Sequence, residues 1–310
     1  MPATSNERRA GPPQASSRPL GGQRTSRSGE RGGHVCRAGP PQASSLPPGG
    51  TGRRPKGAPM TAPALRLQVA ACSEQGTRAI NEDVVLMRDN GPAWFAVLAD
   101  GAGGHADGAE AARRAVGSLQ AGLGDATLPW RPELLNDAVL AAHAEVRGGR
   151  RTQAPMHTTV VALCLDPRRG VALWSHVGDS RLYRLRGHSI DQVTRDDTLV
   201  QGLIDAGVLT PEQARHHPHK HHLAAALGID GELQPHTTAE QPLASGDVFL
   251  LCSDGWWASV GDAGIAASLV TADSPQAWLA AMRDAIVAQG RRDQDNYSAI
   301  AVWIVEAAAA

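Results

Sequence analysis

The 310-residue chain lacks several features that would assign it to a common class of protein. No apolar run approaches the roughly 18 residues that a membrane helix needs, and the charged N-terminus lacks the apolar stretch of a secretory signal. The motifs G-x-x-x-x-G-K-[ST], G-x-S-x-G and H-E-x-x-H are also missing. We therefore expect no membrane association, no P-loop, no serine-hydrolase elbow and no zinc-peptidase site.

Cysteine is scarce. Cys36, Cys72, Cys164 and Cys252 lie far apart and form no C-x-x-C pair. Three of the four sit in apolar runs, which is typical of buried thiols in a reducing compartment and not of a disulfide framework. We therefore expect free thiols and a cytoplasmic protein.

Large apolar residues are nearly absent from residues 1–59. This segment holds 11 Gly and 10 Pro, no Phe, Trp or Tyr, and only Leu20, Val35 and Leu46 among the large aliphatic residues. Such a composition cannot bury enough apolar surface to offset the entropy lost on ordering. We predict that residues 1–59 form a disordered low-complexity tail.

The tail contains a repeat and an excess of positive charge. The nonamer Arg9–Ser17 recurs unchanged as Arg37–Ser45, and ten Lys and Arg stand against two Glu. A basic interaction arm is one interpretation; a tail without a role, or translation that begins at Met60, is another. Residues 60–310 carry 20 basic and 29 acidic side chains, a balance that argues against nucleic-acid binding.

After Met60 the pattern becomes that of one folded domain of about 250 residues. Eight strands are predicted, at Leu65–Cys72, Val84–Met87, Trp94–Ala99, Thr158–Leu165, Val171–Val177, Arg181–Leu185, Val248–Cys252 and Tyr297–Val305. Six helices are predicted, at Ala106–Leu123, Pro132–Val146, Asp196–Ala206, Pro211–His216, Asp262–Val270 and Pro275–Gln289. Because the strands come in clusters with helices between them, the pattern favours an α+β fold of packed antiparallel sheets over a doubly wound parallel sheet.

Acidic residues stand at the ends of several predicted strands. They occur in Asp100-Gly101, Gly178-Asp179, Asp254-Gly255 and the segment Asp293 to Asp295. Each Asp-Gly pair alone is an ordinary turn signal. If the strands end at one rim of a sandwich, however, the carboxylates meet there, and like charges so close need a cation. An oxygen-only set of candidates indicates Mg²⁺ or Mn²⁺.

These acidic residues belong to a series of motifs. In order, they are S-E-Q-G-T-R-A-I-N-E-D at Ser73–Asp83, A-D-G-A-G-G-H at Ala99–His105, Thr158-Thr159, G-D-S-R at Gly178–Arg181, the segment Leu199–Glu212, C-S-D-G at Cys252–Gly255, and Asp295-Asn296. In this order the series resembles the metal-dependent Ser/Thr protein phosphatases of type 2C (PPM family), in their compact bacterial form. The resemblance covers about Leu67 to Val305.

The resemblance implies a fold and a metal centre. The fold is a central sandwich of two antiparallel sheets flanked by helices, in α-β-β-α layers, with a phosphatase domain at 60–310 and a small flap at about 195–230. Asp100 would bridge two Mn²⁺ or Mg²⁺ ions, with the Gly101 carbonyl on one ion and Asp254 and Asp295 on the other. Asp179, with Asp254, would supply a weaker third site.

The resemblance also implies roles for residues around the metals. Glu82 and Asp83 would act through metal-bound water, and Arg78 would hold the substrate phosphate by a bidentate fork. A hydroxide bridging the two ions would attack phosphorus. Three departures from the family pattern stand out. Ala102 occupies the position after the metal Asp-Gly where eukaryotic members carry His, and Asp197 stands where many bacterial members carry His. Asp293 is an alternative to Asp295 as ligand.

The resemblance predicts an enzyme that hydrolyses phosphoserine and phosphothreonine in proteins and opposes a partner Ser/Thr kinase. A catalytically inert pseudophosphatase that binds phosphoproteins is the alternative, and a small phosphoester is a further substrate class.

Five histidines between His216 and His222 are predicted to belong to the flap, and a metal-binding cluster is the other interpretation. Trp256-Trp257 either packs in the core or exposes one ring to a partner.

Overall fold

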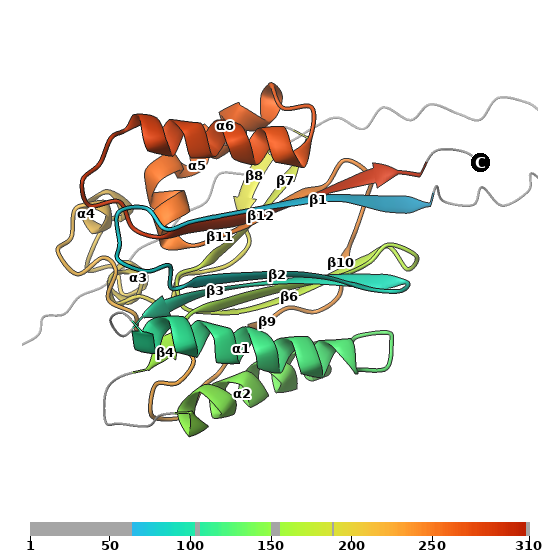
Figure 1. The fold of residues 1–310 in the computed structure, drawn as a ribbon, viewed down its shortest axis with the longest axis horizontal. Helices are drawn as coiled ribbons and strands as arrows, with labels where there is room; N and C mark the ends of the chain where they lie inside the picture. The colour runs from blue at the N-terminus through green and yellow to red at the C-terminus, as the bar shows by residue number, and fades with distance from the viewer. Residues whose placement is uncertain (1–63, 103–105, 150–155, 188, 308–310) are drawn as a thin grey trace, which may run out of the picture. The chain divides into compact units, whose positions relative to one another are not determined.

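Two antiparallel sheets lie face to face in the computed structural model, and helices cover the outer face of each (Figure 1). The structure describes residues 64–102, 106–149, 156–187 and 189–307. The tail predicted for residues 1–59 therefore lies outside the described residues. In the described ranges, no helix combines the length and apolarity needed to cross a bilayer.

The first sheet has the strand order β1-β12-β11-β7-β8. Its strands are β1 (Leu65–Glu74), β12 (Tyr297–Glu306), β11 (Val248–Cys252), β7 (Arg181–Arg186) and β8 (Ser189–Gln192). The second sheet has the order β10-β6-β5-β3-β2, with β4 paired to β3 and β9 paired to β6. Its strands are β10 (Gln241–Pro242), β6 (Val171–Val177), β5 (Val160–Asp166), β3 (Ala93–Ala102), β2 (Asp83–Asn90), β4 (His157–Thr158) and β9 (His236–Thr237).

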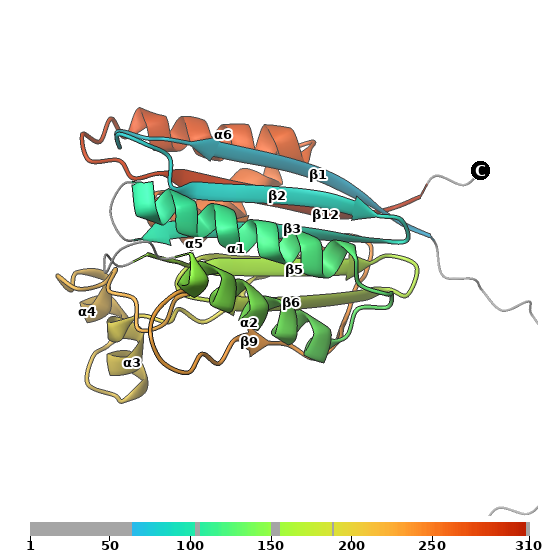
Figure 2. The same ribbon diagram turned by 60° about the horizontal axis from the view of Figure 1, so that its bottom comes forward.

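Helices cover both sheets, and short helices lie at one end of the sandwich (Figures 1 and 2). The helices are α1 (Ala106–Gly124) and α2 (Pro132–Gly148) on the second sheet, α5 (Asp254–Val270) and α6 (Pro275–Ala288) on the first, and α3 (Leu199–Asp205) and α4 (Pro211–Arg215) at the end. Local signals set where α4 and α6 begin. The side chains of Thr210 and Ser274 accept hydrogen bonds from free backbone amides in the first turn, and a proline follows each of these two residues.

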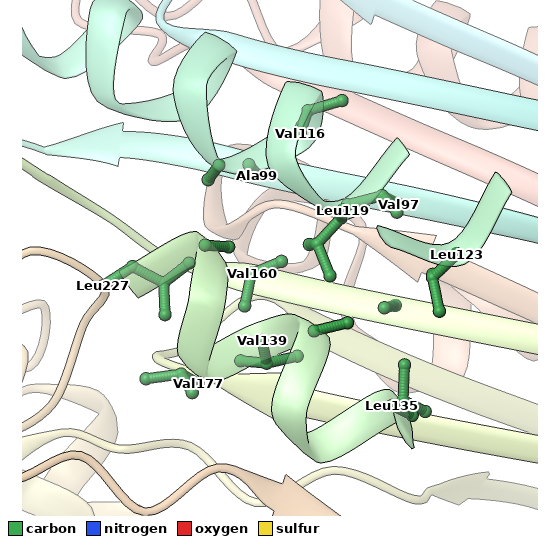
Figure 3. Close-up of a cluster of buried hydrophobic side chains, with 14 of the residues drawn as sticks. Val97, Ala99, Val116, Leu119, Leu123, Leu135, Val139, Val160, Val177 and Leu227 are labelled. Atoms are coloured by element: carbon green, nitrogen blue, oxygen red, sulfur yellow. The ribbon is translucent and has the colours of Figure 1, made fainter. Parts of the chain in front are cut away.

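The alternation of side chains along β3 divides the core into layers. Phe95, Val97 and Ala99 pack toward α1 and α2, whereas Trp94 and Leu98 pack between the two sheets. Figure 3 shows Val97 and Ala99 in the first of these clusters, together with side chains from both helices. Since both faces of β3 are covered, the strand reads as a continuous apolar run.

The predicted α+β sandwich is confirmed, and the predicted elements differ from the structure in detail. The strand expected at Thr158–Leu165 is interrupted at Thr159, and the short strands β8, β9 and β10 were not predicted. These strands are too short to carry an alternating pattern, so only their pairing partners define them.

Two Asp-Gly pairs, each of which alone is a turn signal, lie within regular elements. Asp100-Gly101 lies inside β3, and Asp254 is the first residue of α5. The predicted helix Asp262–Val270 is only the second half of α5, which breaks at Gly261 (φ 69°). The missed first half carries Trp256, which is fully buried, and Trp257, which is half-buried.

Candidate metal centre

Carboxylates from both sheets meet at one end of the sandwich, the end where α3 and α4 lie (Figure 1). Asp100 in β3 pairs in register with Asp83 at the start of β2. Asp179 follows β6, Asp254 follows β11, and Asp295 precedes β12. Antiparallel pairing explains the meeting, because β3, β6 and β11 end at the rim where β2 and β12 begin.

A cavity of about 240 Å³ opens among these carboxylates. Seven of the eight residues that the sequence analysis assigned to the site line it: Arg78, Glu82, Asp100, Gly101, Asp179, Asp254 and Asp295. The eighth, Asp83, is buried beside Asp100. The rest of the described lining consists of Ala102, Thr159, His221, Leu223 and Asn296.

A threonine pair and a close backbone contact position Asp100. The amide of Asp100 donates to Thr159 Oγ1 (3.1 Å), and its carbonyl accepts from the Thr159 amide (2.9 Å) and the Thr158 hydroxyl (2.8 Å). The next residue, Gly101, packs so tightly against α1 that a Cβ would overlap the carbonyl oxygen of Gly108. The sequence marked the threonine pair as a motif, and the structure gives it a positioning role.

Buried polar groups position the acidic pair Glu82-Asp83. Ser253 Oγ donates to Asp83 Oδ2 (2.8 Å), while Asp83 Oδ1 is buried without a hydrogen-bond partner. The Glu82 amide donates to Asn296 Oδ1 (2.9 Å), and Asn296 Nδ2 donates to the carbonyl of Gln75 (2.7 Å). Asn296 thus ties the loop between β1 and β2 to the start of β12.

Asp179 lies in a sharp turn between β6 and β7. Gly178 adopts a φ of 100°, a conformation that a side chain would strain, and its amide donates to Asp197 Oδ2 (2.9 Å). Trp257 Nε1 donates to the carbonyl of Asp179 (2.9 Å), and the Arg181 guanidinium stacks over the Trp257 ring (3.5 Å to its centroid). The half-buried tryptophan therefore supports the turn that carries Asp179.

Asp295 and Asp293, which the sequence left as alternative ligands, have different surroundings. Asp295 lines the cavity, and its Oδ2 lies 2.6 Å from Arg78 Nη2. The Asp293 side chain is 83 % exposed and pairs with Arg291. Of the two, only Asp295 faces the other carboxylates.

The cavity concentrates negative charge. Desolvation, followed by repulsion from neighbouring carboxylates, raises the pKa of Asp100 and of Asp179 well above the usual range. Desolvation also raises the pKa of Asp83 to about 7. Among the described lining residues, five carboxylates stand against two basic side chains, Arg78 and His221.

This donor set fits divalent cations. Buried carboxylates that repel one another are stabilised by a cation between them, and the unpartnered oxygen of Asp83 offers a further acceptor. All the clustered acidic side chains offer oxygen, the ligand that Mg²⁺ and Mn²⁺ prefer.

Two histidines that the sequence analysis did not assign to the site pair with aspartates. His221 Nδ1 is 3.0 Å from Asp254 Oδ2. His236 Nε2 is 2.9 Å from Asp197 Oδ1, and its ring stacks on that of buried His176 (4.9 Å between centroids). Histidine enrichment at 216–222 was the sequence signal for His221, and it could not show which ring faces the carboxylates; His236 lies outside that segment.

The sandwich and its acidic rim define an α-β-β-α protein with a divalent-cation site, and comparisons with known proteins place it in a family. The family model described as Protein phosphatase 2C matches residues 73–294. The match covers more than half of the chain, and the chain therefore belongs to the protein phosphatase 2C family.

Two relatives, one of which is also matched as a crystal structure, illustrate the similarity. Serine/threonine protein phosphatase PstP of Mycobacterium tuberculosis is 38 % identical over 208 residues, covering 63 % of this chain and 37 % of PstP. Protein phosphatase PhpP of Streptococcus pneumoniae is 34 % identical over 190 residues, covering 58 % of this chain and 74 % of PhpP. The crystal structure of PstP from Mycobacterium tuberculosis has a TM-score of 0.68 at 32 % identity, covering 78 % of this chain and 99 % of that chain.

The aligned region also matches a metal-bound structure. The catalytic domain of PstP in complex with two manganese ions has a TM-score of 0.67 at 31 % identity and covers 78 % of this chain and 100 % of that chain. The present chain matches little more than a third of full-length PstP.

Proposed function

We propose that the chain is a Mn²⁺- or Mg²⁺-dependent phosphatase that hydrolyses phosphoserine and phosphothreonine in proteins. One observation carries the proposal: Asp100, Asp179, Asp254 and Asp295 line a single cavity in which carboxylates outnumber basic groups. The names of PstP and PhpP, and the manganese ions bound by the PstP catalytic domain, support the same activity here.

The residues that would hold the ions follow from the cavity and the family resemblance together. The proposed ligands are Asp100 as the bridge, Gly101 through its carbonyl, Asp254 and Asp295, with Asp179 at a weaker third site and Glu82 and Asp83 acting through water. Bound ions would supply Lewis acidity and lower the pKa of the water that attacks phosphorus. Thr158 and Thr159 keep the Asp100 backbone in place.

Arg78 is the proposed phosphate-binding residue. Its side chain is 56 % exposed at the mouth of the cavity, and its Nη2 is paired with Asp295. This pairing orients the planar guanidinium, whose remaining N–H groups suit a phosphate better than a lysine ammonium would.

The carboxylates that line the cavity also argue against the alternative of a catalytically inert pseudophosphatase. A pseudophosphatase would be expected to lose metal-binding carboxylates, whereas this chain keeps every predicted one at the cavity or beside it.

A protein substrate implies a Ser/Thr kinase that phosphorylates it, and we propose such a kinase as a partner. A cytoplasmic location fits the free thiols of Cys72, Cys164 and Cys252.

We further propose that residues 60–310 form the phosphatase domain, with the flap at about 195–230. All described lining residues fall between Arg78 and Asn296. A protein that begins at Met60 should therefore keep full turnover and the melting temperature of the full chain. A several-fold loss of turnover would assign the first 59 residues a role in catalysis.

A hydrolysis assay tests the activity directly. The full chain is incubated with p-nitrophenyl phosphate and with a phosphothreonine peptide, with Mn²⁺, with Mg²⁺ and with EDTA. Turnover of the peptide that needs metal and stops in EDTA is expected. Hydrolysis of p-nitrophenyl phosphate alone would favour a small phosphoester, and binding of the peptide without turnover would favour the pseudophosphatase.

A further inference from the structure

His221 belongs to a cluster of three potential metal ligands at the edge of the cavity. One ligand atom from each of Asp179, His221 and Asp254 lies within 4.8 Å of the others. Asp179 is 4 % exposed, so its carboxylate has little water to stabilise its charge. The cluster thus adds one nitrogen donor to the two carboxylates assigned above to the weaker third site.

The backbone around His221 is anchored. The carbonyl of His222 accepts from the Leu199 amide at the start of α3 (2.9 Å), and Leu223 forms an isolated β-bridge with Thr198. Leu223 also lines the cavity beside His221. The imidazole is therefore presented to the cavity from a fixed base of the flap, although its side chain remains 46 % exposed.

The spacing suits ligation of one ion. Two ligand atoms at right angles on an octahedral ion, each about 2.1 Å from it, lie about 3.0 Å apart. The Nδ1 of His221 and the Oδ2 of Asp254 are separated by 3.0 Å. An ion could thus take both atoms with little movement of either side chain.

We propose that His221 is a protein ligand of the third cation site, where it completes Asp179 and Asp254 with an imidazole nitrogen from the flap. The inference rests on the proposed function, because it assumes that the other carboxylates hold two ions. It adds a metal preference, since an imidazole nitrogen suits transition metals better than it suits Mg²⁺, a hard cation that takes oxygen ligands. Occupancy of this site would also tie the flap to the strand ends that carry the carboxylates.

Pulsed electron paramagnetic resonance on the Mn²⁺-loaded full chain tests the ligand directly. The two tight sites offer only oxygen ligands, so ¹⁴N modulation from a coordinated imidazole is expected only when a third equivalent of Mn²⁺ binds. His221→Asn should remove this nitrogen signal. In calorimetric titrations the same variant should weaken the third Mn²⁺ by on the order of tenfold or more while two tight sites remain.

Two matched variants serve as controls. His222→Asn changes an exposed neighbour whose ring stacks on His219 outside the cavity, and His236→Asn disrupts the separate cluster with His176 and Asp197. Both variants should keep the nitrogen signal and the third site.

The outcomes separate this inference from the proposed function. A third Mn²⁺ without nitrogen modulation, or modulation that survives in His221→Asn, would overturn the role of His221 and leave the phosphatase assignment intact. A full chain that binds no Mn²⁺ tightly would overturn both.

Discussion

At the scale of single residues, the surroundings of each aspartate decide what it can do. Asp100 and Asp293 are the same amino acid, yet one faces a cluster of carboxylates and the other faces solvent. The difference comes from strand pairing, since β3 places Asp100 opposite Asp83.

Replacing Asp100 should therefore lower turnover, whereas replacing Asp293 should not. Asp100→Ala removes the proposed bridging ligand and should lower turnover by about a thousandfold or more, equivalent to at least about 4 kcal/mol of transition-state stabilisation. Asp293→Ala removes only an exposed pair with Arg291 and should leave turnover unchanged. Steady-state kinetics at saturating Mn²⁺ measure both; loss of activity in Asp293→Ala would transfer the ligand role to that residue.

His176 gives a residue-scale prediction about pH. Burial, with a further contribution from the adjacent His236, lowers the pKa of His176 below 6.5. As pH falls below 6.5, the unfolded chain takes up a proton that the folded protein does not, so the unfolding free energy falls until the lower, folded pKa is passed.

The unfolding free energy of the His176→Asn variant should depend less on pH than that of the wild-type chain. Urea unfolding of both proteins, from about pH 7.5 down to about pH 5, measures the difference in slope. Because titratable groups away from His176 have the same surroundings in both proteins, their contributions cancel in the comparison. Parallel pH profiles would show that His176 titrates normally.

At the scale of secondary-structure elements, the approach of α1 to β3 shapes the rim that carries the carboxylates. Gly101 and Gly108 meet backbone to backbone, and a side chain on Gly101 would overlap the Gly108 carbonyl. The helix can therefore start close to Asp100 only because both residues lack a Cβ.

Substitution at this contact should be costly. Gly101→Ala should lower the unfolding free energy by about 1–3 kcal/mol through overpacking, and it should lower turnover because the backbone beside Asp100 must shift. Gly117→Ala, on an exposed position of the same helix with open space around it, should raise stability by roughly 0.5–1 kcal/mol. Denaturant unfolding of the two variants checks the contrast; equal effects would argue against a tight contact.

At the scale of the whole molecule, the rim joins the two sheets. Asp83, Asp100 and Asp179 come from the second sheet and the turn leaving it, whereas Asp254 and Asp295 border strands of the first. Repulsion across this junction opposes the packing of one sheet on the other, and cations bound between the carboxylates would reverse that effect.

Metal removal should accordingly destabilise the whole domain. Mn²⁺ at about 100 times its dissociation constant should add about 2.7 kcal/mol to the unfolding free energy per independent site, and EDTA should remove this gain. Melting curves with and without Mn²⁺ measure the shift, and Asp100→Ala should show a smaller one. A melting temperature that does not respond to Mn²⁺ in the wild-type chain would contradict a metal site at this junction.

The sequence by itself determined the sheet-and-helix class, most of the strands and the set of acidic residues, because these depend on local apolar patterns and on motifs of a few residues. The tertiary structure decided where strands β8 to β10 form and that a helix starts at Asp254. It also decided that Asp295, and not Asp293, faces the cavity. The roles of the Thr158-Thr159 pair and the positions of His221 and His236 were decided in the same way. Most of these features arise from contacts between segments far apart in the chain, and such contacts leave no periodic signal in either segment alone. Strand β8 pairs with its neighbour β7 and is too short to carry such a signal.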